Sequence, residues 1–262
     1  MFRKKLKNIS ERQNAALKNW SPEKRWFTPI IEYSVIYLSK FTMNFLNKVE
    51  IRDLENLYGA KNEPRPLITF SNHVSIFDDP FITACFGTQI ARERYIGADA
   101  QNFFSKKLTG LFFSQGKCVP IVRGAGFNQP GFHYLQEKLT ENKWVHIFPE
   151  GGRTRDPGSG LKTPFTQGLA HLILHSKPLI LPFIHSGMEK ILPVGGRFPK
   201  VGKKATVVFG KTFDSMDKSF SDFYKLYEQP EQDAKRQAMQ LVTEWSQETL
   251  SQLQKNLDSN PS

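Results

Sequence analysis

The sequence has few cysteines and lacks a long uncharged apolar run. Its 262 residues include two cysteines, Cys85 and Cys118, which are too few for a disulfide framework. The apolar and aromatic stretch 26–49 is interrupted by Glu32 and Lys40. No run of 18 or more uncharged apolar residues therefore predicts a helix that spans a bilayer.

Acidic residues are also in short supply, because 25 Asp and Glu stand against 36 Lys and Arg, giving a formal charge of +11. That charge, together with 22 phenylalanines, suits a protein resting on an anionic membrane surface. It also suits nucleic acid, but no helix-turn-helix, zinc-finger or aromatic RNA-binding pattern is present. We therefore expect a lipid partner and no nucleic acid.

The N-terminal part is expected to differ from the rest of the chain. Residues 1–25 are basic and have no apolar core after the first charges, which argues against a secretory signal peptide. They are either an organelle-directing segment or a solvated tail. Residues 26–49 have apolar side chains at helical spacing and predict either an amphipathic helix in the membrane interface or a helix packed on the core. We expect a membrane-associating segment over 1–49 and a catalytic domain with a C-terminal packing helix over 50–262.

From residue 67 onward, strand-like and helix-like segments alternate, which predicts an α/β fold with a central, largely parallel sheet flanked by helices. The predicted strands are 67–70, 94–98, 117–121, 144–148, 179–185 and 205–210. The predicted helices are 80–86, 102–112, 132–140, 165–175 and 231–257. The aromatic segment 102–113 is expected either to line a groove for an acyl chain or to belong to the core.

A histidine and two aspartates follow the first of these strands. We expect a tight turn to fold Asp78 back toward the ring of His73, and Asp79 to be the N-cap of a helix that begins at Pro80. An imidazole oriented by a carboxylate can take a proton from a hydroxyl and return it to a leaving group. The alternative is a strand-end histidine that only satisfies backbone carbonyls. A metal site is not expected, since no second His or Cys lies near.

Arginines also follow two later strands. Arg123 ends the strand 117–121 beside a Gly-Ala-Gly turn, and Glu150, Gly151 and Arg153 follow the strand 144–148. Guanidinium groups in glycine-rich loops suit phosphate, because the planar fork binds two oxygens and glycine lets backbone amides approach. Ligands of open α/β sheets bind at the carboxyl ends of strands. The pattern predicts an enzyme acting on a phosphorylated alcohol.

These motifs resemble those of the glycerophospholipid acyltransferase family. The four family motifs occur in order, as His73 with Asp78, residues 116–123, residues 148–153 and residues 179–183. Within the family, the similarity is strongest to transacylases that exchange acyl chains between phospholipids and lysophospholipids and remodel cardiolipin in mitochondria.

The resemblance implies a layered acyltransferase-type fold and direct acyl transfer. His73 would be the general base and acid, and Asp78 would orient it. The residues implied to hold the substrate phosphate and glycerol are Arg123, Glu150, Gly151 and Arg153. Ester-to-ester exchange is nearly isoenergetic, so neither nucleotide, metal nor thioester cofactor is expected. The implied partners are phospholipid, lysophospholipid and a mitochondrial membrane surface.

Two alternatives stay open. The sequence of residues 152–155 resembles lysophosphatidate acyltransferases, which use the thioester of coenzyme A. A catalytically inactive lipid-binding protein could have the same fold, although the presence of both His73 and Asp78 argues against it.

Overall fold

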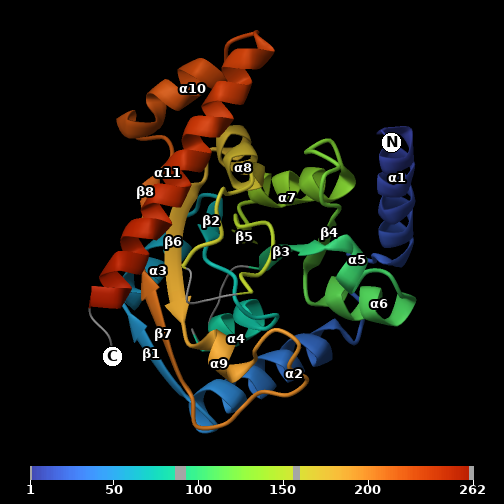
Figure 1. Ribbon diagram of the computed structural model, residues 1–262, viewed down its shortest axis with the longest axis vertical. Helices are drawn as coiled ribbons and strands as arrows, with labels where there is room; N and C mark the ends of the chain where they lie inside the picture. Colours follow the sequence, from blue (N-terminus) through green and yellow to red (C-terminus); the bar gives the residue numbers. More distant parts are fainter. Residues whose placement is uncertain (1, 86–92, 156–159, 260–262) are drawn as a thin grey trace.

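The computed structural model describes residues 2–85, 93–155 and 160–259, which form a mixed α/β structure (Figure 1). The strands are β1 (Lys48–Arg52), β2 (Leu67–Phe70), β3 (Arg94–Asp99), β4 (Cys118–Ile121), β5 (Trp144–Ile147), β6 (Leu179–Ser186), β7 (Lys204–Phe209) and β8 (Phe213–Asp214). The helices are α1 (Phe2–Asn19), α2 (Thr28–Lys40), α3 (Leu54–Asn62), α4 (Asp78–Cys85), α5 (Ala100–Phe103), α6 (Lys107–Gln115), α7 (Pro130–Thr140), α8 (Gly168–Ser176), α9 (Met188–Ile191), α10 (Ser221–Tyr227) and α11 (Gln232–Ser259). A π-helical turn (Phe41–Phe45) extends α2, and a 3₁₀ turn (Lys218–Phe220) precedes α10.

The strands form one sheet in the order β1-β7-β6-β2-β5-β3-β4, with β8 paired to β6. Strands β2, β3, β4, β5 and β6 run parallel, as do β1 and β7, whereas β6 pairs with β7 and β8 in antiparallel fashion. The predicted fold class is confirmed. Because the central strands are parallel, the loops after β2, β3, β4 and β5 all lie on the same side of the sheet, at the carboxyl ends of the strands.

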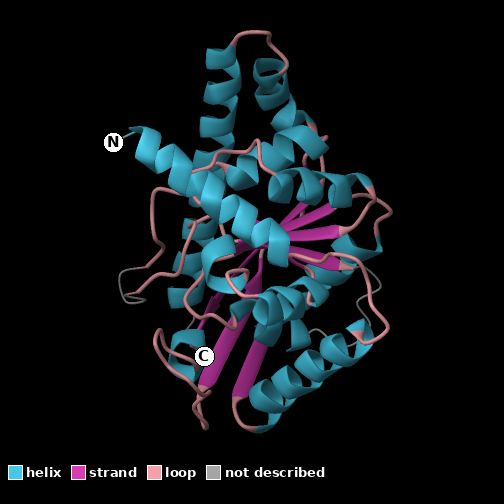
Figure 2. Ribbon diagram, turned by 90° about the vertical axis from the view of Figure 1, so that its right-hand side faces the viewer, coloured by secondary structure: helices cyan, strands magenta, loops and turns pink. Residues whose placement is uncertain are grey.

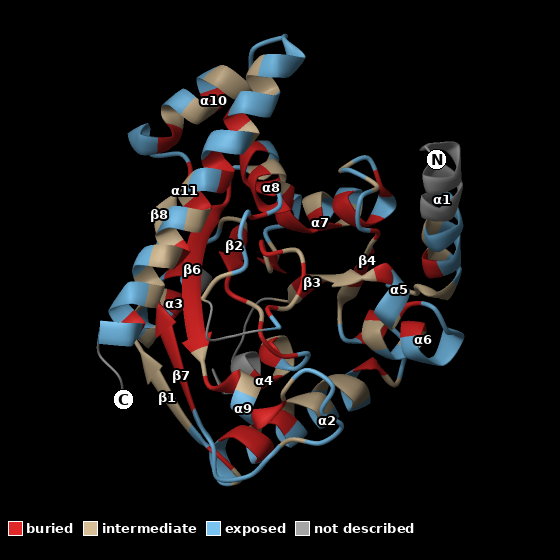
Figure 3. Cartoon of the chain, viewed as in Figure 1, coloured by how far each residue is buried: buried red, intermediate tan, exposed pale blue. Residues whose placement is uncertain are grey.

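Helices cover both faces of the sheet (Figure 2), and alternate strand residues pack against different helices. Ile68 and Phe70 belong to a core shared with α7, α8 and α11, whereas Leu67 packs in a second core with residues of α3, α4 and α9. Strands β2 and β5 are therefore buried at every residue, and β6 at all but its last (Figure 3). This two-sided burial explains why their sequences are continuous apolar runs.

The N-terminal segment is attached to α5 and α6 by specific hydrogen bonds. The Asn19 side chain donates to the Phe104 carbonyl at 2.8 Å, and the Gln115 side chain donates to the carbonyls of Ser21 and Glu23 at 3.0 and 3.2 Å. None of the helices described is long and apolar enough to cross a membrane. The division of the chain at residue 49 stays a prediction.

The predicted strands and helices are found within a few residues of their expected bounds, with the segment 102–112 split into α5 and α6; residue 86 of the predicted helix 80–86 lies outside the described residues. Strands β1 and β8 and helices α1, α3, α9 and α10 were not predicted. Strand β1 lies at the edge of the sheet. It is short, and the charged residues Lys48, Glu50 and Arg52 alternate in it with apolar ones. Charged edge strands of this kind protect a sheet from pairing with other chains.

Candidate active site

The turn after β2 folds Asp78 onto His73, as the sequence predicts. The Asp78 carboxylate is fully buried and its Oδ2 lies 3.0 Å from Nδ1 of His73. The same oxygen accepts hydrogen bonds from the backbone amides of Val74 and Ser75, at 2.7 and 2.8 Å. Three donors on one oxygen stabilise the ionised carboxylate. A carboxylate at Nδ1 places the ring proton there, which leaves Nε2 as the basic nitrogen.

The His73 ring is also fixed by stacking on Phe148, with ring centroids 4.0 Å apart and planes 10° apart. Its side chain is 18% exposed and lines a cavity of about 1900 Å³ at the strand ends. The ring is therefore held by Asp78 at Nδ1 and by Phe148 on one face, and it remains accessible from the cavity. This is the arrangement that a proton-transfer residue requires.

Glu150 holds the backbone of His73. Its carboxylate is 2% exposed and accepts hydrogen bonds from the His73 amide at 2.6 Å, the Lys162 amide at 2.8 Å and the Thr154 hydroxyl. The Thr154 amide in turn donates to the His73 carbonyl at 2.7 Å. Both backbone groups of His73 are thus bound by the loop after β5. The sequence predicts Glu150 to bind substrate, but the structure places it behind His73, bonded to protein groups.

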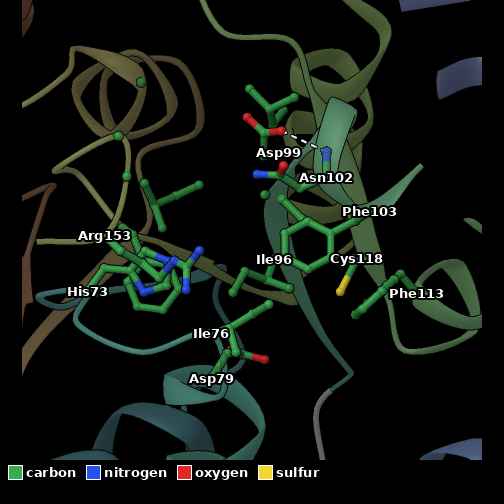
Figure 4. A pocket seen from close by; sticks show the side chains of 18 of the residues that line it. His73, Ile76, Asp79, Ile96, Asp99, Asn102, Phe103, Phe113, Cys118 and Arg153 are labelled. Carbon is green, nitrogen blue, oxygen red and sulfur yellow. Dashed lines mark hydrogen bonds between the residues drawn. The ribbon is translucent and has the colours of Figure 1, made fainter. Parts of the chain in front are cut away.

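Gly151 and Arg153 lie on the same loop and line the cavity. Gly151 has a φ of +64°, and a Cβ added to it would lie 2.6 Å from Cγ2 of Thr166. Glycine is therefore required by both the backbone conformation and the close packing. The loop turns there, and Figure 4 shows Arg153 and His73 among the side chains that line the cavity.

Arg123 follows β4 and lines the same cavity. Its Nε lies 2.9 Å from Oδ2 of Asp99, the last residue of β3, and its side chain is 58% exposed. The structure thus brings Arg123, Arg153 and His73 to one cavity, as the motif order predicts. Among the described residues, no group of three or more His, Cys, Asp or Glu side chains is arranged to hold a metal ion.

The prediction for Asp79 is wrong. Helix α4 begins at Asp78, and Asp79 lies inside its first turn, where its carboxylate forms a two-pronged ion pair with Arg94 of β3. Sequence reasoning considered only local partners for Asp79, whereas Arg94 is distant along the chain and comes close only through the sheet. The Asp79 side chain also lines the cavity (Figure 4).

Two residues that sequence reasoning missed tie the His73 loop to β6. The Asn72 side chain donates to the His185 carbonyl at 2.9 Å and accepts from its amide at 3.0 Å. Nε2 of His185 lies 3.0 Å from the Asn72 carbonyl and 3.8 Å from Oδ2 of Asp78. The signal in the sequence is a histidine at the end of an otherwise apolar strand.

A second buried histidine lies close to these residues. His146 of β5 is 1% exposed, and its ring nitrogens lie 2.9 Å from the Thr69 hydroxyl and 3.4 Å from the Ser71 hydroxyl. Burial lowers the pKa of His146 well below its ordinary value, and the nearby Arg94 lowers it further. The neutral ring is therefore a structural part of the base of the site.

The cavity has an apolar side opposite His73. Ile96, Phe103, Phe113 and Cys118 line it (Figure 4), which supports the acyl-groove interpretation of the segment 102–113. Burial raises the pKa of the Cys118 thiol to about 12, although part of its surface remains accessible. A thiol with such a pKa is a poor nucleophile.

The chain is similar to several proteins of known name. It is 34% identical to Tafazzin of Drosophila melanogaster over 75% of this chain and 54% of that protein. It is 33% identical to N-acylphosphatidylethanolamine synthase of Arabidopsis thaliana, over 69% and 68% of the two chains. Identity to Taffazin of Dictyostelium discoideum is 31%, over 67% and 63%. The chain thus spans about half to two thirds of the length of these curated relatives.

The fold also has a solved counterpart. The crystal structure of the 1-acyl-sn-glycerophosphate acyltransferase PlsC from Thermotoga maritima matches with a TM-score of 0.59 and 16% identity, over 90% of this chain and 83% of that one. At this identity the match concerns the fold alone. The sequence profile of the family described as Acyltransferase matches residues 48–186, which include His73, Asp78, Arg123 and Glu150. With more than half of its length matched in this way, the chain belongs to the acyltransferase family.

Proposed function

We propose that this protein is a membrane-associated transacylase that moves an acyl chain from a phospholipid to a lysophospholipid. The observation that carries the proposal is the position of His73, which is oriented by buried Asp78 and faces a cavity with cationic and apolar walls. A lysophospholipid has the matching parts, namely a hydroxyl, a phosphate and an acyl chain.

In this mechanism, Nε2 of His73 takes the proton of the acceptor hydroxyl. The oxygen attacks the ester carbonyl of the donor, and the tetrahedral intermediate collapses with cleavage of the bond to the donor glycerol oxygen. That oxygen receives the proton back from His73, so one ester forms, one ester breaks and no proton is gained or lost. Asp78 stabilises the imidazolium that exists between the two proton transfers.

We propose direct transfer without an acyl-enzyme intermediate. The Cys118 thiol, with its pKa raised to about 12 by burial, is unsuited to attack an ester. The hydroxyl of Ser75, close to the dyad, is buried and donates to the Leu192 carbonyl at 2.9 Å. Arg153 and Arg123 would bind the phosphates of the lipids during the transfer.

The exposed side chains of α2 and of the residues just before and after it support membrane association. Trp26, Leu38 and Phe45 are 84, 66 and 77% exposed, and aromatic and apolar side chains of this kind enter the interface of a bilayer. Glu32 pairs with Lys117, so its charge is compensated within the protein. Because residues of α2 also line the cavity, a lipid could pass from the surface to His73 without crossing water.

Cardiolipin as the remodelled lipid and the mitochondrion as the location belong to the same proposal. They rest on the sequence resemblance and on the relatives named Tafazzin. Two other acyl transfers have specific support. The Gly-Arg-Thr-Arg sequence of residues 152–155 favours a coenzyme-A-dependent lysophosphatidate acyltransferase, and the Arabidopsis relative's name points to the amine of phosphatidylethanolamine as acceptor.

One experiment separates these activities. The purified protein is incubated with vesicles that contain cardiolipin, labelled phosphatidylcholine, phosphatidylethanolamine and a lysophospholipid, with and without acyl-coenzyme A. We expect exchange of labelled chains without coenzyme A. Strict dependence on acyl-coenzyme A would replace the proposal with the lysophosphatidate activity, and label on the nitrogen of phosphatidylethanolamine would replace it with N-acylation. Vesicle binding without any transfer would indicate a lipid-binding protein.

A further inference from the structure

Two cations converge on the backbone of Gly152. The position that a Cβ of this residue would occupy lies 3.4 Å from a terminal nitrogen of Arg123 and 3.4 Å from Nζ of Lys162. Both side chains line the cavity, although they come from loops after different strands. Since glycine has no side chain, no methyl group stands at this position, and both cations come within contact distance of it.

Arg123 is held in this position by Asp99. Oδ2 of Asp99 lies 2.9 Å from Nε of Arg123, and Oδ1 accepts a hydrogen bond from the Asn102 amide at 2.9 Å (Figure 4). The Asp99 side chain is 13% exposed, whereas that of Arg123 is 58% exposed. With Nε occupied by the carboxylate, the terminal nitrogens of the guanidinium are available to bind two oxygens of one anion.

Lys162 is held at its backbone. Its amide donates to Oε2 of Glu150 at 2.8 Å, so the buried carboxylate that positions His73 also fixes the start of this side chain. Within the described part of the chain, the ammonium of Lys162 has no carboxylate partner. Two neighbouring positive charges repel each other, and an anion bound between them would remove this repulsion.

We propose that Lys162 and Arg123 together bind the phosphate of a glycerophospholipid substrate above Gly152, with Asp99 as the residue that positions Arg123. The proposal rests on the proposed function only for the class of substrate. It adds Lys162 to the substrate-binding residues and assigns to Asp99 the positioning of Arg123. The phosphate could belong to the donor or to the acceptor.

Kinetics on four variants test the site. Lys162→Ala should raise the apparent KM for one of the two lipids by about tenfold, with kcat changed much less, because the phosphate is bound equally in the ground and transition states. The matched control is Lys255→Ala, which removes the same charge from an exposed position on α11. Gly152→Ala should have a similar effect by filling the space, whereas Gly59→Ala, whose added methyl meets nothing within 4 Å, should not.

Asp99→Asn tests the positioning role. Asparagine still caps the Asn102 amide but cannot pair with the guanidinium, so KM should rise by several-fold. In an Arg123→Ala background the same change should have no further effect, since the group that it positions is gone. Asp99→Glu should restore part of the loss. Equal effects in both backgrounds would show that Asp99 acts only on the stability of the fold.

A binding measurement separates failure of this site from failure of the proposed activity. We expect glycerol 3-phosphate to raise the Tm of the full chain, and glycerol to leave it unchanged. The shift should be lost in Lys162→Ala and in Gly152→Ala and retained in Lys255→Ala, whichever acyl donor the enzyme uses. A KM increase for lysophospholipid alone assigns the phosphate to the acceptor, and one for phospholipid alone assigns it to the donor. Unchanged KM and Tm shift in Lys162→Ala would overturn the proposal.

Discussion

His73 and Arg153 line the same cavity, but the protein holds their surroundings in different ways. Around His73, the carboxylates of Asp78 and Glu150 are buried and each accepts several hydrogen bonds from nearby backbone and side-chain groups. Around Arg123 and Arg153, side chains are partly exposed, and Arg123 has one ion pair. We call His73 with Asp78 and Glu150 the buried base, and Arg123 with Arg153 the cationic rim.

The difference corresponds to two chemical requirements. Proton transfer needs donor and acceptor at hydrogen-bond distance and in line, and a displacement of about 1 Å costs about a hundredfold in rate. A phosphate offers several equivalent oxygens, and a flexible cation can follow it. We therefore expect changes in the buried base to lower kcat or stability, and changes in the cationic rim to raise KM.

The largest expected effect is at the dyad. His73→Ala should lower kcat by about a thousandfold or more, because the general base is lost. Asp78→Asn should cost a large part of that factor through loss of the correct tautomer and of the charge that stabilises the imidazolium. Far-ultraviolet circular dichroism should show that His73→Ala keeps the fold. A variant with near-normal kcat would remove His73 from the mechanism.

Glu150→Gln should have the next largest effect. The amide keeps one acceptor oxygen but presents an NH₂ group to the Lys162 amide, which leaves a buried donor unpaired and costs about 1–3 kcal/mol. We expect a lower Tm and a fall in kcat of about 10- to 100-fold through displacement of His73. Glu141→Gln, which removes a partly exposed carboxylate paired with Lys138, is the control. If Glu150→Gln raised KM alone, Glu150 would belong to the cationic rim.

Asp78 and Asp79 are neighbours in the sequence but have different partners, so variants of the two also test the comparison. Asp79→Asn breaks the partly buried ion pair with Arg94 and should cost about 1–2 kcal/mol of unfolding free energy. Its effect on kcat should be far smaller than that of Asp78→Asn, because the Asp79 carboxylate pairs with Arg94, whereas that of Asp78 holds the His73 ring. Denaturant unfolding and rate measurements on both variants distinguish the two roles. Equal loss of kcat would contradict this division.

Arg153→Ala should act mainly on KM. Loss of a charged hydrogen bond to phosphate should raise KM by about tenfold, with a smaller change in kcat and in Tm. Lysine at this position should restore only part of the affinity, since it offers a point charge in place of a planar fork. Unchanged kinetics would mean that Arg153 is an ordinary surface residue of the loop.

Much of the fold and the site could be predicted because the signals are local. Each central strand is a continuous apolar run bounded by polar residues, and the pairing of His73 with Asp78 depends on a single turn. Because the strands are parallel, Arg123 and Arg153 lie at the same ends of the strands as His73. This could be predicted without knowing any side-chain contact.

The remaining features depend on contacts between distant parts of the chain. The pairing of Asp79 with Arg94 and of Asn72 with His185 exists only after the sheet has formed, and nothing near these residues indicates their partners. Lys162 was overlooked for the same reason, since its neighbour Arg123 lies in another loop. The role of Glu150 as a buried acceptor also follows from a bond across strands, to the His73 amide.

The smallest expected effect concerns pH and His146, the buried histidine of β5. Burial, with Arg94, His73 and His185 as further causes, lowers the pKa of His146 in the folded protein well below its ordinary value. In the unfolded chain this ring binds a proton as the pH falls through about 6.5. The unfolded state then carries the extra proton, and so the free energy of unfolding should fall below that pH by up to about 1.4 kcal/mol per unit. Urea unfolding of the wild type and of His146→Gln from pH 8 to 5 should show a flatter curve for the variant. Arg153→Ala should keep the wild-type slope, because an arginine keeps its charge throughout this range. A wild-type slope in His146→Gln would mean that another group causes the loss of stability in acid.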